Sequence, residues 1–206
     1  MRAETRARRQ REIEQAAYAV LAQRGYAGTS MLAIARAARA SNETLYNWYG
    51  DKQGLFRSLV ARNAEEVRRL LESRISGQDD PLETLRLLGP KLLELLTGPG
   101  PVALNRAAAA DPSNELGAAI GQAGRESITP LIAEVMEAAR KRGQIAFRDV
   151  ADAVGLYLDL LVGDLQIRCV IGRQAPPSAV VRRQRAALAS TRLGILLSPE
   201  GKTAAG

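Results

Sequence analysis

Apolar residues recur along almost the whole chain at the spacing of an α-helix, and no segment shows the strict apolar–polar alternation of a β-strand. In residues 9–24, for example, Ile13, Ala17 and Val20 lie three or four positions apart and would share one helix face. The pattern therefore predicts an all-α protein of about nine helices.

The first 50 residues predict three helices, of which the last two are short. A first helix over residues 9–24 is followed by a glycine, a common C-terminal stop. Thr29 and Ser30 are candidate N-caps of a second helix, and Ser41 is one for a third helix over residues 42–49. Two short helices joined by a tight turn are typical of a helix-turn-helix, whose last helix enters the DNA major groove. The outward positions of that helix hold groups that can bond to bases or phosphates: Asn42, Glu43, Thr44, Tyr46 and Asn47.

The helical period continues beyond residue 56 in longer segments. Because proline inside a helix deletes a hydrogen bond, we expect a kink or a break at Pro130. The predicted organisation is a helix-turn-helix domain of residues 1–56 with a basic N-terminal arm, followed by a helical domain of residues 57–206. Further helices are expected from the end of the third helix to about residue 75 and at about 82–96, 102–110, 114–142, 149–171 and 178–197.

The last two predicted helices carry more apolar surface than one small bundle needs to bury. Burial against a second copy of the chain would account for this excess, and an intramolecular core is the alternative. The apolar residues are Val154, Tyr157, Leu158, Leu161 and Leu165 in the first of these helices and Val180, Val181, Leu188, Leu193, Ile195 and Leu196 in the second.

Positive charge is concentrated near the N-terminus. Residues 1–60 hold ten basic and five acidic side chains, and so carry most of the net charge of +7. Most of the aromatic residues lie in the same segment. A basic, aromatic-containing module is typical of a domain that faces a polyanion, although a solvated basic face without a partner has the same composition.

Several classes of site are excluded by residue content. The chain has no histidine, which removes catalytic dyads and metal sites that need an imidazole. Its single cysteine, Cys169, can form neither an intrachain disulfide nor a thiolate cluster. No N-terminal signal or apolar run of about 18 residues indicates export or a membrane span. We therefore expect a cytoplasmic protein without catalytic residues, a metal site, a cofactor or a membrane anchor.

Two segments resemble the DNA-binding signature of tetracycline-repressor (TetR/AcrR) regulators. They are TSMLAIARAA at residues 29–38 and SNETLYNWYGDKQGLF at residues 41–56. The shared features are the Ile34-Ala35 pair, the Thr-Leu-Tyr core of the third helix, and Lys52. This sequence departs from the family where Arg39 and Ala40 replace the usual Gly and Val of the turn, and where Trp48-Tyr49 replaces His-Phe. A positive φ at Arg39 would strain the turn.

The resemblance implies that Tyr46 and Lys52 contact DNA phosphates, with Thr29 or Ser30 contributing at the start of the second helix. Base contacts would then come from the third helix, while Trp48 either packs at the edge of the core or contacts DNA. The arm carrying Arg2, Arg6, Arg8 and Arg9 would reach a minor groove or form a disordered tail. The full set of candidate DNA contacts is Thr29, Ser30, Ser41, Asn42, Glu43, Thr44, Tyr46, Asn47, Trp48 and Lys52.

The resemblance also implies a ligand-responsive regulator, most often a repressor. Such a protein forms a homodimer through its last two long helices, here about residues 149–171 and 178–197, and binds a palindromic operator. A small-molecule inducer inside the C-terminal bundle releases it from the DNA. Arg106 is notable because an arginine in the bundle interior would need a carboxylate or an anionic ligand. The candidate pocket residues are Leu88, Leu92, Val102, Leu104, Asn105, Arg106, Met136 and Tyr157.

A helical protein-interaction adaptor that kept the fold without a DNA role is the alternative, and Arg39 and Ala40 in the turn are the sequence features that favour it. An enzyme is the least favoured class, because no histidine, phosphate loop or metal-ligand cluster is present.

Overall fold

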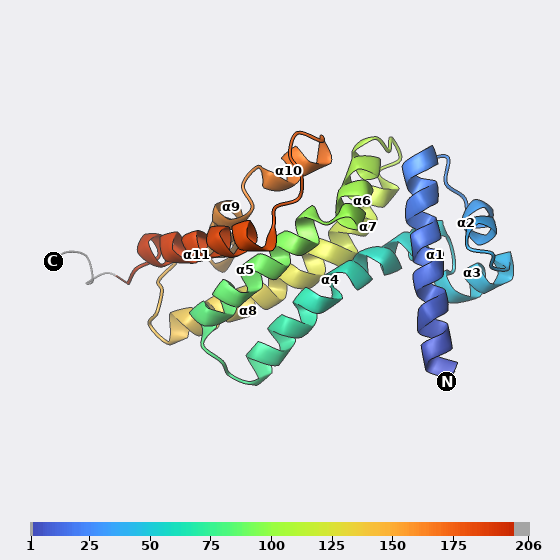
Figure 1. The fold of residues 1–206 in the computed structure, drawn as a ribbon. Coiled ribbons are helices and arrows are strands. Elements are labelled where there is room, and N and C mark those ends of the chain that lie inside the picture. Colours follow the sequence, from blue (N-terminus) through green and yellow to red (C-terminus); the bar gives the residue numbers. More distant parts are fainter. Residues whose placement is uncertain (1, 200–206) are drawn as a thin grey trace. The chain divides into compact units, whose positions relative to one another are not determined.

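A computed structural model describes residues 2–199, including the side chains from residue 5 onward, and this part of the chain is helical with no strand (Figure 1). The expected all-α fold is confirmed. None of the described helices is both long and apolar enough to cross a membrane. The helices are α1 (Arg2–Arg24), α2 (Met31–Ala37), α3 (Asn42–Tyr49), α4 (Lys52–Ser76), α5 (Pro81–Thr97), α6 (Pro99–Ala109), α7 (Glu115–Ile120), a π-helical turn η1 (Gly121–Arg125), α8 (Glu126–Lys141), α9 (Val150–Leu161), α10 (Leu165–Val170) and α11 (Ala179–Leu196).

The helices form two compact units. The N-terminal unit contains the chain up to Asn63 together with Pro99–Arg125, and the C-terminal unit contains Ala64–Gly98 and the chain from Glu126 onward. Helix α4 contributes to both units, and α6 and α7 belong with the helix-turn-helix. The proposed functional boundary after residue 56 lies inside α4 and remains a prediction.

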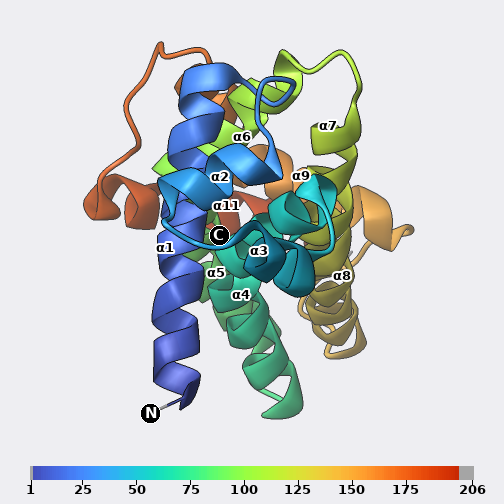
Figure 2. The same cartoon turned by 90° about the vertical axis from the view of Figure 1, so that its right-hand side faces the viewer.

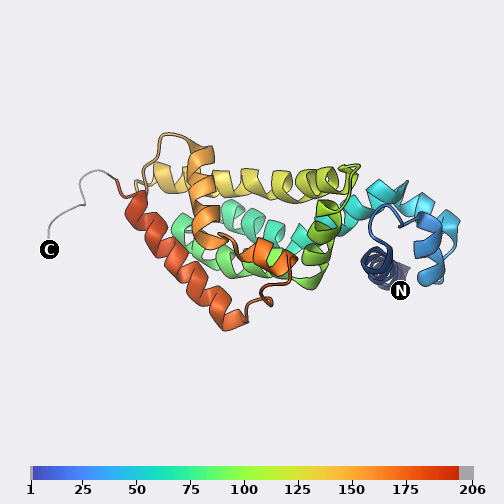
Figure 3. The same cartoon turned by 90° about the horizontal axis from the view of Figure 1, so that it is seen from above.

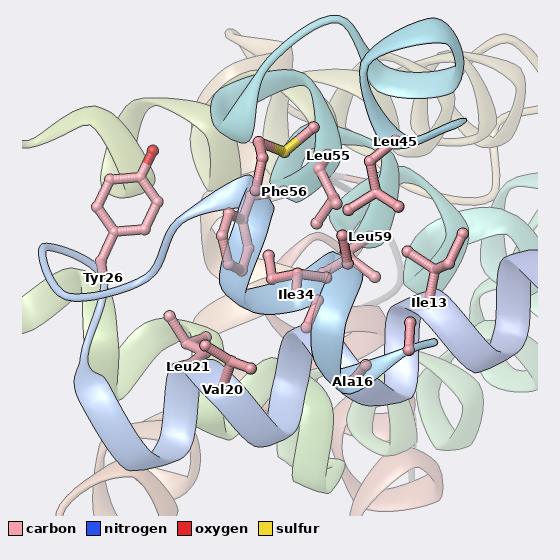
Figure 4. Close-up of a cluster of buried hydrophobic side chains, with 14 of the residues drawn as sticks. Ile13, Ala16, Val20, Leu21, Tyr26, Ile34, Leu45, Leu55, Phe56 and Leu59 are labelled. Atoms are coloured by element: carbon pink, nitrogen blue, oxygen red, sulfur yellow. The ribbon is translucent and has the colours of Figure 1, made fainter. Parts of the chain in front are cut away.

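In the N-terminal unit α2 packs on α1, and α3 packs on α2 (Figure 2). Both short helices begin at serine caps, as the sequence indicates: the Ser30 hydroxyl accepts a hydrogen bond from the Ala33 N–H, and the Ser41 hydroxyl accepts one from the Thr44 N–H. Their inward residues join one buried cluster, shown in part in Figure 4. The cluster also includes Leu104 of α6 and Leu116 of α7, which explains why these helices belong to this unit.

The turn between α2 and α3 is closed although it lacks the usual glycine. Arg39 has a φ of 50°, in the left-handed region. The Ala40 N–H donates to the Ala35 carbonyl at 2.9 Å, and the Arg39 N–H donates to the Arg36 carbonyl at 3.2 Å. These two bonds are the Schellman closure of a helix C-terminus, in which glycine normally holds the left-handed position. Arg39 therefore accepts backbone strain without opening the turn.

The basic N-terminal segment is helical rather than a disordered arm. Helix α1 begins at Arg2, although the side chain of Arg2 lies outside the described part. The Arg9 guanidinium donates to the Arg39 carbonyl and pairs with Glu12 at 2.7 Å. The Arg6 guanidinium lies 5.3 Å from the Trp48 ring centroid. These contacts tie the first turns of α1 to the helix-turn-helix and explain why the helix extends beyond its expected start at residue 9.

The C-terminal unit is built around α5, α8, α9 and α11, which pack on one another (Figure 3). Helix α11 approaches α5 closely at Gly89, where an added Cβ would lie only 2.5 Å from the Cβ of Ala186. Leu161 of α9 lies against the same point. Glycine is therefore required by packing at this crossing.

The expected long helix over residues 149–171 is divided into α9 and α10. Gly163 in the connection has a φ of 50°, and the Arg185 guanidinium of α11 donates to the carbonyls of Leu161 and Val162. A cation that bonds to the last carbonyls stabilises a helix C-terminus. The break is therefore fixed by a residue more than twenty positions away in the sequence.

The expected helix over residues 114–142 is also divided, but not at Pro130. Pro130 lies inside α8, and the irregular turn is η1, which directly precedes that helix. A proline ring clashes with the carbonyl four residues earlier, here that of Glu126, so the distortion falls on its N-terminal side. Two glycines in η1, at positions 121 and 124, make that segment easy to distort.

Candidate nucleic-acid interface

Helix α3 is anchored by one fully buried residue, Leu45, and presents polar side chains to solvent. Asn42, Glu43 and Asn47 are exposed, and Tyr46 is 49% exposed. Their amide, carboxylate and phenol groups can donate to or accept from base edges and phosphates. The structure thus places these four sequence-predicted residues together on the exposed side of the helix.

The hydroxyls at the start of α3 are engaged with each other. Ser41 is exposed and Thr44 is half-buried, and their side-chain oxygens lie 2.7 Å apart. Since Ser41 also accepts from the Thr44 N–H, this pair fixes the first turn of α3.

Thr29 and Ser30 differ in their availability. Thr29 is buried, and its hydroxyl donates to the Gly25 carbonyl at 2.7 Å. Ser30 is exposed and caps α2. The Thr29 side chain therefore closes the α1–α2 connection, and of the two hydroxyls only that of Ser30 lies at the surface.

Trp48 packs at the edge of the helix-turn-helix core, which is one of the two roles that the sequence predicted for it. It is half-buried, and its ring meets that of Tyr49 edge-on with centroids 6.5 Å apart. With Arg6 over its ring, Trp48 links α3 to the first turns of α1.

Lys52 lies in the first turn of α4, directly after α3 and the Gly50-Asp51 turn. The Asp51 carboxylate accepts from the Gly54 N–H at 2.6 Å and so caps α4. The Lys52 ammonium donates to the Tyr26 carbonyl at 3.1 Å. Lys52 is half-buried, which holds its charge close to the protein surface.

Helix α3 carries no basic side chain, so positive charge beside its exposed polar residues comes from neighbouring elements. Arg36 in the last turn of α2 and Arg39 in the turn are both exposed. Neither was among the predicted contacts, although their positions in the helix-turn-helix signature would have indicated them. Lys and Arg near DNA gain affinity by releasing counterions from phosphates.

Family models match both parts of the chain. Residues 13–59 match the model of bacterial regulatory proteins of the tetR family, and residues 83–191 match that of the C-terminal domain of AefR-like transcriptional repressors. The second match alone spans more than half of the chain. This protein belongs to the TetR family. As a member of that family it is a DNA-binding transcriptional regulator.

Solved TetR-family structures resemble the whole chain. A regulator from Mesorhizobium loti is 27% identical, with a TM-score of 0.72, over 94% of this chain and 98% of that one. A TetR regulator from Agrobacterium tumefaciens is 28% identical, with a TM-score of 0.71, over 93% and 95%. The flavonoid-responsive regulator FrrA is 25% identical, with a TM-score of 0.68, over 95% and 100%. No curated protein matches the sequence.

The residues expected to line a TetR-type ligand pocket fall into both compact units. Leu88, Leu92, Met136 and Tyr157 are buried in the C-terminal unit, where the Tyr157 hydroxyl donates to the Leu85 carbonyl at 2.8 Å. Burial raises the pKa of Tyr157, so this hydroxyl stays protonated.

Helix α6 supplies the remaining candidates, which belong to the N-terminal unit. Leu104 is buried in the helix-turn-helix core, and Val102 is half-buried. The Asn105 amide donates to the Pro101 carbonyl at 2.9 Å. Arg106 is exposed, so the expectation that it lies in the bundle interior is wrong. The outward position follows from the burial of Leu104, which sets the inner face of α6.

Most of the apolar residues of the last helices are either buried or exposed, and Leu158 is half-buried. The buried ones are Val154, Tyr157, Leu161, Leu165 and Leu193. The exposed set, which we call the α10–α11 apolar face, consists of Ile167, Ile171, Val180, Val181, Leu188, Ile195 and Leu196. Several of these are more than half exposed, and a group of exposed large apolar side chains is typical of an interaction surface.

Within residues 2–199, no three His, Cys, Asp or Glu side chains gather as they would around a metal ion. Cys169, the single cysteine of the chain, is a buried thiol. The family and fold are those of regulators rather than enzymes.

Proposed function

We propose that this TetR-family regulator is a homodimeric, ligand-responsive repressor that acts in the cytoplasm, binds a palindromic operator and is released by a small-molecule inducer. The observation that carries the DNA-binding part is the exposed polar face of α3, which Leu45 anchors and Ser41 caps. The family's helix-turn-helix places such a helix in the major groove.

The proposed contacts fall into two groups. Tyr46, Lys52 and Ser30 contact phosphates and position α3. The exposed Arg36 and Arg39 add positive charge beside it. Asn42, Glu43 and Asn47 read bases, since a carboxylate accepts from the cytosine amino group and an amide pairs with adenine. Ser41 and Thr44 shape the start of α3, while Thr29 and Trp48 contribute through the local backbone and the edge of the core.

The α10–α11 apolar face supports the dimer. Covering it with the same face of a second copy removes large aliphatic side chains from water. A two-fold dimer places its recognition helices roughly 34–36 Å apart and thus reads two half-sites separated by one turn of DNA.

Ligand release follows from a population shift. A small molecule that binds one arrangement of the C-terminal unit better than another moves the equilibrium away from the DNA-binding form. The aliphatic core around Leu88, Leu92 and Met136 favours a largely apolar ligand. The match to AefR-like repressors and the similarity to a flavonoid-responsive regulator support both the repressor role and a small-molecule signal.

The test is selection of duplexes from a random-sequence DNA library by the purified protein at near-physiological salt. Enrichment of an inverted repeat supports a dimeric, sequence-specific regulator and yields the operator. A folded, dimeric protein that enriches no duplex would favour the adaptor function instead.

Three variants then separate the two groups of contacts. Tyr46→Phe and Lys52→Ala should weaken binding to cognate and random duplexes alike, each by about 1–3 kcal/mol for the cognate site. Asn47→Ala should change which sequence is enriched. Equal losses on both duplexes from all three variants would contradict the assignment.

A further inference from the structure

Lys52 contacts Tyr26, which lies in the connection between α1 and α2. Its Nζ donates to the Tyr26 carbonyl at 3.1 Å and lies 3.9 Å from the centroid of the Tyr26 ring. An ammonium has three N–H donors and no acceptor, and an aromatic face attracts a cation. The Tyr26 carbonyl takes one of these donors, so donors remain for an anion.

The Tyr26 ring is itself fixed from two directions. Tyr26 is 2% exposed and meets the Phe56 ring of α4 edge-on, with centroids 5.3 Å apart. Its hydroxyl donates to Glu115 Oε2 of α7 at 3.2 Å. Burial and the nearby carboxylates raise the pKa of Tyr26, so its hydroxyl remains a donor. The ring therefore joins α4 to α7 within the N-terminal unit.

A buried carboxylate completes this arrangement. Asp111, between α6 and α7, accepts from the Ser113 N–H at 3.1 Å and from the Leu116 N–H at 3.3 Å. Burial alone would raise the pKa of Asp111, but hydrogen bonds from the Ser113 hydroxyl and from these two N–H groups, together with the charge of Lys52, lower it. The α6–α7 connection thus presents a negative charge towards Lys52.

We propose that Tyr26 is a positioning residue of the DNA interface: its ring and carbonyl hold the Lys52 ammonium at the start of α4, and α7 fixes the ring through Glu115. The inference rests on the proposed function, in which Lys52 contacts a phosphate. A lysine side chain held in advance loses less rotamer freedom on binding. Displacement of α7 would free the ring and weaken the phosphate contact, which gives the segment 99–125 a direct route to the DNA surface.

The first experiment inverts the electrostatics of the ring with only a small increase in its size. Pentafluorophenylalanine at position 26 inverts the quadrupole that attracts the ammonium, and Tyr26→Phe is the matched control. We expect the Tyr26→Phe protein to bind the selected operator within about twofold of wild type, and the pentafluoro protein to bind about 3- to 10-fold more weakly than Tyr26→Phe. For the pentafluoro protein, the slope of log K against the logarithm of the salt concentration should be shallower by up to about one unit, as for Lys52→Ala.

Two double variants test whether these residues act through each other. In the Lys52→Ala background, the pentafluoro ring should cause no further loss of affinity. Glu115→Gln should weaken DNA binding by about twofold in the wild-type background. In the Tyr26→Phe background, which already lacks the hydroxyl, it should leave DNA binding unchanged. Losses that add in the first of these pairs would overturn the positioning role of Tyr26, and losses that add in the second would overturn the link through Glu115.

A measurement without DNA separates this inference from the proposed function. In NMR spectra of the free protein, the ring should shift the CεH₂ protons of Lys52 upfield in wild type and Tyr26→Phe, and the shift should shrink with pentafluorophenylalanine. Unshifted protons in wild type overturn the inference whatever the DNA result. If the shift is present and wild type binds no duplex, the proposed function fails and the DNA role of Tyr26 fails with it. If wild type binds its operator and the pentafluoro protein binds as tightly as Tyr26→Phe, only the inference fails.

Discussion

The two compact units bury similar aliphatic side chains but expose different chemistry. In the N-terminal unit, α3 turns Leu45 inward and amide, carboxylate and phenol groups outward. In the C-terminal unit, α10 and α11 leave isoleucine, leucine and valine side chains in solvent. A hydrogen-bonding surface fits a nucleic acid, whereas an aliphatic surface fits another protein surface. In this molecule the two units therefore differ in their exposed residues rather than in their cores.

The units also differ in how their helices are held. Short α2 and α3 depend on local closures, namely two serine caps and the Schellman turn at Arg39. Longer α5 and α11 depend on a close approach at Gly89, which is distant in sequence from its contact Ala186. Changes at each kind of contact should therefore have different consequences.

The largest effect is expected from charge on the α10–α11 apolar face. The double variant Leu188→Asp and Ile195→Asp should convert the proposed dimer to a monomer and weaken operator binding roughly 100-fold or more, because the two half-sites would no longer be engaged together. Sedimentation velocity and fluorescence anisotropy measure the two quantities. Ala151→Asp, an exposed position at the start of α9, is the control for added negative charge. A variant that stays dimeric would show that this face is not the interface.

The next effect concerns packing inside the C-terminal unit. Gly89→Val should lower the free energy of unfolding by about 2–3 kcal/mol, since α5 and α11 must separate to admit the side chain. Gly117→Ala in α7, where an added Cβ meets nothing within 4 Å, should instead be neutral or more stable by up to about 1 kcal/mol. Chemical denaturation at fixed protein concentration measures both. Similar values for the two variants would remove the contrast between the units.

A smaller effect, a gain in stability, is expected at the turn between α2 and α3 in the N-terminal unit. Arg39→Gly relieves the left-handed strain and should raise the free energy of unfolding by about 0.5–1 kcal/mol, because the Arg39 carbonyl that accepts from Arg9 is retained. The same variant removes a cation near α3 and should bind DNA more weakly. Arg36→Gly, at a helical position nearby, should lower stability and serves as the control.

The smallest effect is a pH dependence that can be compared between the units. Asp111 in the N-terminal unit and Asp80 in the C-terminal unit both have pKa values lowered below 3.8, and both accept backbone N–H bonds. A lowered folded pKa adds stability above pH 3.8 that is lost as the pH falls through the folded pKa. Asp111→Asn and Asp80→Asn should therefore reduce the melting temperature at pH 7, and each difference from wild type should disappear in acid. A difference from wild type that is the same at every pH would assign the effect to packing.

Local signals in the sequence predicted the helix-turn-helix of the N-terminal unit well. The caps Ser30 and Ser41, the buried Leu45 and the outward polar residues of α3 all follow from spacing within a few positions. The sequence left Thr29 and Ser30 as alternatives because a hydroxyl before a helix can cap it, face DNA or bond backward, and here that of Thr29 bonds to the Gly25 carbonyl.

Contacts between distant residues explain what the sequence did not predict. The break between α9 and α10 depends on Arg185, and the grouping of α6 with the helix-turn-helix depends on Leu104 joining that core. Helical periodicity reports which face is buried but not against which helix. The pocket candidates were chosen by their expected helix order, and so Arg106 was placed in the interior although it lies on the surface.

The return of residues 99–125 to the N-terminal unit bears on how regulators of this kind can be recombined. The chain crosses between its units after Asn63, after Gly98 and after Arg125. A chimera that grafts residues 1–63 onto another sensor would lose Leu104 and Leu116 from its core, as well as the Glu115 bond to Tyr26. A transplant that preserves operator reading must therefore carry two separate stretches of sequence.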